Sequence, residues 1–239
     1  MSINIFVITK IFHQYSKFAN QTLDWFPSDD IIRYIDNCKS QRDLLEKYDW
    51  IDKKITYKFN SHGFRCDEFT EDPSIMFLGC SNTIGIGLPL EDNWPTLVSN
   101  ELNLKMVNLG IGGSGSDTAF RLANHYIPQL KPKILIHLES YEGRLSLISK
   151  NEIYEFLPSN YPKEFEKFYF EWINCKENLE LHELKHNFAI ELICNKNNIK
   201  YIPLSLDNFI QLDSARDLSH WGILSSKAFY KKVLAKINN

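Results

Sequence analysis

The stretch IMFLGCSNTIGIG, residues 75–87, joins an apolar run to small and polar residues at Gly79, Cys80, Ser81 and Asn82. A short, uninterrupted apolar run is typical of a strand that is buried on both faces, as in a parallel sheet. The polar residues after it then lie at the carboxyl end of the strand, where ligands gather in open parallel sheets. The stretch therefore predicts a fold class and the edge of the sheet that carries function.

Similar apolar runs recur along the chain and alternate with segments of helical periodicity. The runs occupy residues 105–110, 133–139 and 200–206. The helical segments occupy residues 90–103, 116–130, 162–197 and 223–237. Strands that alternate with helices predict an α/β domain, residues 73–239, in which helices cover both faces of a mainly parallel sheet.

The first 72 residues lack this alternation. Ser28 or Asp29 is a favoured cap for a helix that follows it, and the pattern over 55–69 predicts a strand, a turn at 62–63 and a second strand. We therefore expect a helical and hairpin extension, residues 1–72, that packs on the main domain.

Composition limits the partners. The chain has 27 basic and 30 acidic residues, a formal net charge of -3, so it offers no broad positive field for nucleic acid. Five scattered cysteines fit neither a disulfide framework nor a metal knuckle and favour a reducing compartment. The apolar opening, residues 3–12, contains Lys10 and is too short to span a bilayer. These features predict a cytoplasmic protein with a small-molecule substrate and no membrane or nucleic-acid partner; they do not indicate an oligomeric state.

Ser81 is a candidate nucleophile because the sequence also contains the groups that would activate it. A serine hydroxyl needs a base, usually a histidine that a carboxylate orients. Asp217 and His220, three residues apart, supply both. The alternative is structural: Ser81 could cap a helix, and Asp217 and Ser219 could cap the final helix.

The glycine-rich segment GIGGSGSD, residues 110–117, follows the second apolar run. Its backbone could approach a substrate closely and donate hydrogen bonds to a developing oxyanion. Gly110, Gly112 and Gly115 also fit the G-x-G-x-x-G pattern of dinucleotide sites, although Glu139 lies 24 residues beyond Gly115. An enzyme that binds a nucleotide or S-adenosylmethionine is therefore an alternative.

The sequence HELKH places His182, Glu183 and His186 in the H-E-x-x-H pattern of zinc proteases. No neighbouring motif identifies a third ligand, and Lys185 lies inside the pattern. We favour two histidines beside the apolar stripe of an amphipathic helix, and we predict neither a metal nor an organic cofactor. The stripe consists of Leu181, Leu184, Phe188 and Leu192.

Three segments together resemble the conserved blocks of the SGNH (GDSL-type) hydrolases. GCSNTIGIG resembles the first block, NLGIGGSGSD the second, and ARDLSHWG the last, in the same order along the chain. The resemblance implies a flavodoxin-like three-layer α/β/α sandwich and a serine esterase. It also implies Ser81 as nucleophile, His220 as base and Asp217 as the residue that orients it, with the N–H groups of Ser81 and Gly113 as oxyanion donors.

The chain departs from the family pattern at two places. Cys80 replaces a common aspartate, and the segment ESYEGR, residues 139–144, lacks the asparagine of the third block, which leaves Tyr141 or Ser140 as a further oxyanion donor. The resemblance to this family, many members of which act on small acetyl esters or acetylated sugars, implies an esterase for small acyl groups such as acetyl, with a carbohydrate ester as one candidate substrate. A related binding module with impaired turnover is the alternative.

Other residues of these segments are candidates for substrate binding. Asn82 follows the proposed nucleophile, and Arg144 ends the segment that replaces the third block. Arg65, in the extension, could line the same cleft as Arg144 and bind an acidic group of the substrate.

Overall fold

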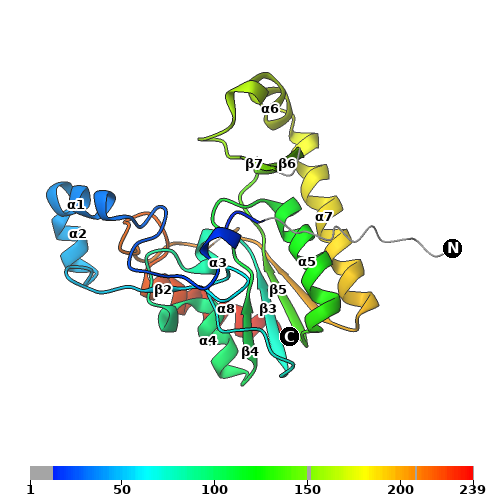
Figure 1. The fold of residues 1–239 in the computed structure, drawn as a ribbon, viewed down its shortest axis with the longest axis horizontal. Coiled ribbons are helices and arrows are strands. Elements are labelled where there is room, and N and C mark those ends of the chain that lie inside the picture. The colour runs from blue at the N-terminus through cyan, green and yellow to red at the C-terminus, as the bar shows by residue number, and fades with distance from the viewer. Residues whose placement is uncertain (1–12, 150–151, 208, 239) are drawn as a thin grey trace.

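The computed structural model describes residues 13–149, 152–207 and 209–238 (Figure 1). The predicted absence of a signal peptide or membrane span at residues 3–12 concerns residues outside these ranges. Within them, no helix has the length and apolar character needed to cross a membrane.

The central sheet consists, in the described residues, of four parallel strands, each of which the apolar runs predict. They are β3 (Ser74–Leu78), β4 (Lys105–Asn108), β5 (Ile134–Leu138) and β8 (Lys200–Leu204). Their order in the sheet is β4-β3-β5-β8. The chain adds β4 on one side of β3 and then β5 and β8 on the other side, so the strand order reverses between β3 and β5. This is the strand order of flavodoxin-like sheets, and ligands bind such sheets at the point of reversal.

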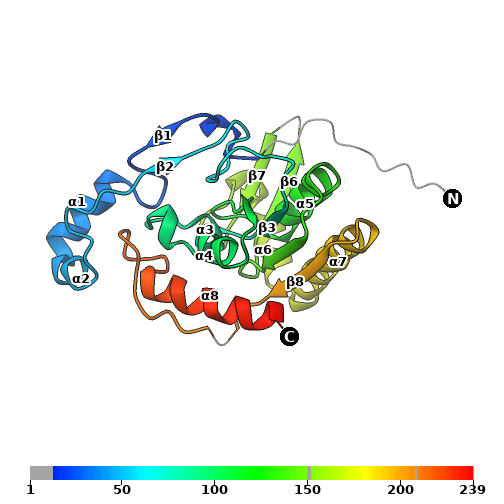
Figure 2. The ribbon, with the colours of Figure 1, turned by 90° about the horizontal axis from the view of Figure 1, so that it is seen from below.

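Helices cover both faces of this sheet (Figure 2). On one face, Ile75 and Phe77 of β3 pack in a cluster with α4 (Trp94–Glu101) and α8 (Ile223–Asn238). On the other, Met76 and Leu78 share a cluster with residues of α5 (Ser116–Leu130) and α7 (Lys176–Lys196). Alternate side chains of one strand thus enter two separate cores, and the predicted three-layer α/β/α sandwich is confirmed.

The prediction of one helical region over 162–197 is only partly correct. The chain forms a 3-10 turn, Lys163–Phe165, and then two helices, α6 (Glu166–Ile173) and α7, separated where Cys175 adopts an extended conformation. An antiparallel pair, β6 (Leu145–Ser149) and β7 (Glu152–Phe156), precedes them and was not predicted. The pair lies outside the central sheet, so neither of its strands has the continuous apolar character that marked the others.

The apolar stripe predicted for α7 does not face the core. Leu181, Leu184, Phe188 and Leu192 are exposed. The face that α7 turns toward α5 instead buries His182, Ile190 and Cys194. The helix was predicted correctly, but its buried face was not, because polar contacts between α5 and α7 replace part of the usual apolar packing.

The extension differs from its predicted form. It contains η1 (Ser16–Phe18), β1 (Thr22–Leu23), α1 (Ile31–Ser40), α2 (Arg42–Lys47) and β2 (Tyr57–Lys58). The turn near His62 is present, because Asn60 Oδ1 accepts the N–H groups of His62 and Phe64. The second strand is not: β2 pairs with β1, far back in the sequence, instead of with residues after the turn.

The cap of α1 is Asp30, whose Oδ1 accepts the Arg33 N–H at 2.9 Å. Neither Ser28 nor Asp29, the two predicted caps, has this role. Asp29 is buried and forms an ion pair instead, with Oδ2 2.7 Å from Arg216 Nη2. The local sequence predicted Asp29 as a helix cap, but its carboxylate pairs with Arg216, which is distant in the sequence.

Aromatic side chains join the extension to the main domain. Tyr15, Phe26 and Phe59 are buried in the same cluster as Met76 and Leu78 of β3. The division at residue 72 stays a prediction, but the described part of the extension completes one of the two cores.

Arg216 joins the extension to the segment that carries Asp217. Its guanidinium is bidentate to Asp29, donates to the carbonyls of Lys53 and Asp24, and lies 4.0 Å from the ring centroid of Trp25. We expect Arg216→Met to lower the free energy of unfolding by about 3–5 kcal/mol, because it leaves the buried charge of Asp29 uncompensated. Urea denaturation of the intact chain measures this change.

The matched control is Arg42→Met, which removes an exposed pair with Glu46 whose Nε–Oε1 distance is also 2.7 Å. Exposed pairs contribute about 0–1 kcal/mol. Equal losses of stability in the two variants would contradict the role given to Arg216.

Candidate active site

Ser81 lies directly beyond the end of β3, at the point where the strand order reverses. Gly79 turns the chain with φ +154°, and a Cβ there would overlap the Thr83 side chain. Ser81 then begins the short helix α3 (Ser81–Ile84). It does not cap that helix, because Cys80 holds the cap position. The Ser81 side chain is thus not engaged as a cap, and with an exposed fraction of 8% it lines a pocket.

Asp217 and His220 form a hydrogen-bonded pair in the loop before α8. Asp217 Oδ2 lies 2.5 Å from His220 Nδ1, and Asp217 Oδ1 accepts the backbone N–H groups of Ser219 and His220. Burial alone would raise the pKa of Asp217, but the hydrogen bonds and charge of His220, together with the two N–H groups, hold it below its usual value. An ionised carboxylate can only accept, so Nδ1 carries the proton and Nε2 is the acceptor.

Asp213, and not Asp217, caps the final helix. Its carboxylate accepts the N–H groups of Leu224 and Ser225 at 2.9 and 2.8 Å. The structural alternative for Asp217 and Ser219 is therefore wrong, because another aspartate already satisfies the helix terminus. Sequence reasoning missed Asp213 because it lies ten residues before Ile223, where α8 begins, whereas the local cap signal concerns the residue next to the helix.

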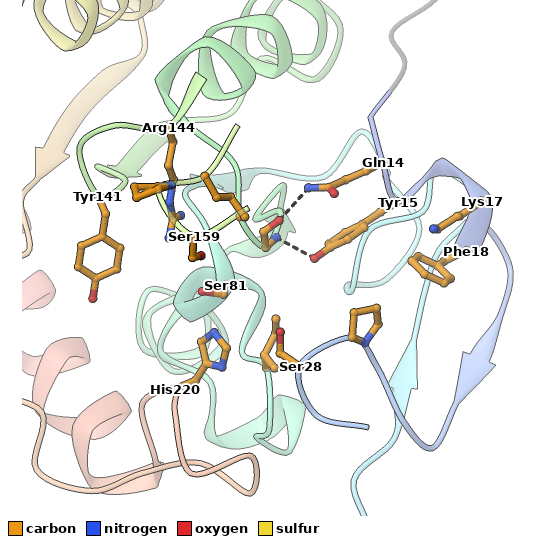
Figure 3. Close-up of a pocket in the computed structure, with 16 residues that line it drawn as sticks. Gln14, Tyr15, Lys17, Phe18, Ser28, Ser81, Tyr141, Arg144, Ser159 and His220 are labelled. Carbon is orange, nitrogen blue, oxygen red and sulfur yellow. Dashed lines mark hydrogen bonds between the residues drawn. The ribbon is translucent and has the colours of Figure 1, made fainter. Parts of the chain in front are cut away.

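A pocket of about 620 Å³ brings the predicted site residues together (Figure 3). This volume suits a small ligand. The main domain contributes Ser81, Ile86, Gly112, Gly113, Tyr141, Arg144, Leu157, Pro158, Ser159 and His220. The extension contributes Gln14, Tyr15, Lys17, Phe18, Pro27 and Ser28. Five segments of the main domain and the extension thus line one space.

Ser81 and His220 both line this pocket, and Figure 3 shows the imidazole beside the serine. In the described residues, the Ser81 hydroxyl has one polar contact, a weak one at 3.9 Å to Cys80 Sγ, and no hydrogen bond to His220. Catalytic hydrogen bonds are often long without substrate and shorten when it binds. The placement of both side chains on one pocket therefore suits a nucleophile and its base.

The glycine-rich loop is held by the extension. The Gly112 N–H donates to the Tyr15 hydroxyl at 2.8 Å, and Gln14 Nε2 donates to the Gly112 carbonyl at 2.7 Å. Within the described chain, the N–H groups of Ser81 and Gly113 have no partner. Two N–H groups without partners thus border the pocket, and they are the two that the family resemblance implies as oxyanion donors. Sequence gave no signal for Gln14 and Tyr15, which lie almost a hundred residues from Gly112.

We expect Tyr15→Phe to lower kcat more than it changes KM, because the Gly112 N–H loses its acceptor and the neighbouring Gly113 N–H loses its fixed direction. The loss should be about tenfold, part of the factor that one oxyanion donor contributes. Ester hydrolysis by the variant measures it. Tyr126→Phe is the control, since Tyr126 is equally buried but does not line the pocket; the same kcat loss in both variants would contradict this role for Tyr15.

The predicted substrate-binding residues separate into two groups. Arg144 and Tyr141 line the pocket, and Tyr141 has an exposed fraction of 53%. Asn82 and Arg65 do not line it. The Asn82 side chain accepts the Trp221 N–H at 3.3 Å and so supports the residue after His220. Arg65 is buried and donates to backbone carbonyls, so it is structural.

Ser140, the second candidate for the missing third-block donor, is not among the residues that line the pocket. Tyr141 lies on the opposite side of Ser81 from Tyr15 (Figure 3). Of the two candidates, Tyr141 is therefore the one placed to reach a bound ligand.

The histidines of the HELKH segment contact α5. His182 Nε2 lies 3.4 Å from Asp117 Oδ2, and His186 Nδ1 lies 3.2 Å from Ser116 Oγ. In the described residues, no three metal-binding side chains converge on a common point. These polar contacts explain why α7 buries histidine where an apolar stripe was expected.

The dinucleotide interpretation of the glycine-rich loop is also less favourable. The loop follows β4, an edge strand of the described sheet. Tyr15 occupies the space beside Gly112, and a Cβ at Gly115 would meet the backbone of Arg144. The carboxylate of Asp117 lies in the first turn of α5, where a pyrophosphate would need positive potential. The close contacts at Gly112 and Gly115 and the acidic first turn of α5 are thus unfavourable for binding a pyrophosphate.

Comparisons with known proteins give distant structural likenesses. No protein-family model matches the chain, and no curated protein matches it. Among solved structures, TesA is 14% identical, with 69% of this chain and 97% of that chain covered and a TM-score of 0.40. The psychrotrophic esterase EstA from Pseudoalteromonas sp. is 14% identical over 70% of this chain and 100% of that chain, with a TM-score of 0.37.

A third solved structure is a putative lipolytic protein of the G-D-S-L family from Desulfitobacterium hafniense. It is 12% identical over 68% of this chain and 98% of that chain, with a TM-score of 0.33. The third protein is of the family that the three sequence blocks resemble. The similarity of all three proteins to this chain is too low to assign it an activity.

Proposed function

We propose that this chain is a serine esterase of the SGNH type that cleaves small acyl esters. One observation carries the proposal: a single pocket contains Ser81, a histidine already paired with a buried carboxylate, and two backbone N–H groups without partners in the described chain. These are the nucleophile, the oriented base and the oxyanion donors of an acyl-transfer site. The order of the three sequence blocks supports the same proposal.

In the proposed reaction, Ser81 Oγ attacks the ester carbonyl while His220 Nε2 takes its proton. The oxygen of the tetrahedral intermediate, now negatively charged, accepts hydrogen bonds from the N–H groups of Ser81 and Gly113. His220 then gives its proton to the departing alcohol, and the acyl group stays on Ser81. Water, deprotonated by His220, attacks the acyl-serine, and the acid leaves as Ser81 regains its proton.

The substrate is a small ester, with acetyl as the first acyl group to test. The pocket volume of about 620 Å³ also leaves room for a sugar ring on the alcohol side. The five cysteines are free in the described chain, which fits the reducing, cytoplasmic compartment that we propose. A binding module that has lost turnover is the second candidate, because the third-block asparagine is absent.

The experiment is a panel of esters incubated with the purified chain: 4-nitrophenyl acetate, 4-nitrophenyl butyrate and an O-acetylated sugar. We expect release of acid from at least one, faster for the shorter acyl group, without any added metal or cofactor. Saturable binding of these esters without release would support the binding module instead. Saturable binding of a dinucleotide, with every ester left intact, would overturn the esterase in favour of a nucleotide-binding enzyme.

A further inference from the structure

Three arginines lie close to the candidate active site, and two of them are buried and bonded to protein groups. Arg65 donates to the carbonyls of Ile84, Gly85 and Leu88, so it fixes the segment after α3. The charge of Arg216 is paired with Asp29. Neither residue lines the pocket.

Arg144 differs from both. It lies on the pocket wall immediately before β6 and is half-buried. Its Nη1 donates to the Ser114 carbonyl at 3.2 Å, and its guanidinium lies 5.2 Å from the ring centroid of Tyr141. A guanidinium has five N–H donors. In the described chain, the other donors of Arg144 have no acceptor, and no carboxylate pairs with its charge.

A second base borders the same pocket from the extension. Lys17 is exposed, and its Nζ lies 5.1 Å from the ring centroid of Phe18; it has no acidic partner among the described residues. Figure 3 shows Lys17 and Arg144 on different sides of Ser81, with the guanidinium of Arg144 extending toward the serine.

The pocket contains no compensating negative charge. None of the described residues that line it is an aspartate or a glutamate. Asp217 lies behind His220, is buried and is paired with the imidazole. Glu142, in the same loop as Arg144, is exposed and does not line the pocket. The two charged side chains on the pocket wall, Arg144 and Lys17, are therefore both basic, and the negative charge of Asp217 lies behind His220.

We propose that this pocket takes an ester that carries a second, negatively charged group, and that Arg144 binds this group while Lys17 adds to the field. This inference rests on the proposed esterase function and names its substrate class. The planar fork of a guanidinium matches the two oxygens of a carboxylate, and a half-buried position strengthens the pairing relative to open water. A neutral ester of equal size would leave the free donors of Arg144 unused.

The test compares matched esters with and without a carboxylate. Phenyl acetate is the neutral reference, 4-acetoxybenzoate carries the charge on the alcohol side, and monophenyl succinate carries it on the acyl side. We expect kcat/KM for at least one charged ester to exceed that for the reference by about tenfold or more, the factor expected of a hydrogen-bonded charge pair. The preference should arise mainly in KM and should weaken with added salt.

Variants then test the residues. Arg144→Gln is expected to reduce the ratio of charged to neutral kcat/KM by about tenfold, Arg144→Lys to reduce it less, and Lys17→Met to reduce it slightly. The control is Lys47→Met, which removes an equal charge from an aromatic contact of the same kind, with Nζ 5.2 Å from the Tyr48 centroid, outside the pocket. Lys47→Met should leave the ratio unchanged.

The outcomes separate this inference from the proposed function. Two results overturn the inference and leave the proposed esterase function intact. One is a parent chain whose kcat/KM for the neutral ester equals or exceeds that for both charged esters. The other is an Arg144→Gln variant whose ratio of charged to neutral kcat/KM is unchanged. If no ester is cleaved, calorimetry of 4-acetoxybenzoate with Ser81→Ala still tests the charge: binding that Arg144→Gln abolishes in the same background supports the inference, and absence of binding overturns it.

Discussion

Replacing Ser81 with alanine is expected to lower kcat for short acyl esters by about a thousandfold or more, because the reaction loses its nucleophile. The residual rate would come from substrate binding and the oxyanion donors alone. Stability should change little, since the Ser81 hydroxyl has only a weak contact with Cys80 in the described chain. Steady-state rates and a urea denaturation curve for the same preparation measure both quantities.

Ser219→Ala is the matched control for this substitution. Ser219 is exposed, lies beside His220, and uses only its backbone N–H in a hydrogen bond with Asp217. Its loss should leave kcat within about twofold of the parent, as is usual for surface substitutions. Comparable rates for Ser81→Ala and the parent chain would remove Ser81 from the mechanism.

Asp217→Asn is expected to produce the second largest loss, about a thousandfold or more in kcat. An amide keeps the shape of the carboxylate but can turn its NH₂ toward His220 Nδ1, which then becomes the acceptor and leaves the proton on Nε2. An imidazole in that form cannot take the Ser81 proton. Because hydrogen bonds keep the pKa of Asp217 below its usual value, the parent carboxylate stays ionised at neutral and mildly acidic pH.

The control is Asp213→Asn, which neutralises another buried carboxylate of the same loop. Asp213 caps α8 through Leu224 and Ser225, so its loss should affect the free energy of unfolding and not kcat. Asparagine has one acceptor oxygen, so one of the two N–H groups loses its partner, and the expected destabilisation is about 1–3 kcal/mol. If the two variants lost kcat equally, the pairing of Asp217 with His220 would not be the cause.

The central fold could be predicted because its signals are local. Each strand of the sheet is a continuous apolar run, and α5 occupies the residues that periodicity assigned to it. The β6–β7 pair gave no such signal, because it lies outside the buried sheet. The buried face of α7 was predicted wrongly because His182 and His186 contact Asp117 and Ser116, polar partners on another helix.

The candidate site could be predicted where its residues follow the carboxyl ends of the strands. Ser81, Gly113 and His220 line one pocket, with Asp217 behind the histidine, as the spacing along the sheet edge suggested. Tyr15 and Gln14 could not be found, because their contact with Gly112 joins residues that are adjacent only after folding. Asn82 and Arg65 looked like ligand-binding residues, but tertiary contacts with Trp221 and with backbone carbonyls engage their side chains.

The central claim is that Ser81 is an activated nucleophile, and a fluorophosphonate probe with mass spectrometry tests it most directly. The probe phosphonylates a serine only where a base and oxyanion donors activate it. The account predicts one adduct per chain, located on Ser81, retained in Ser219→Ala and strongly reduced in His220→Ala. An unlabelled chain, or an adduct on another residue with Ser81 unmodified, would contradict it.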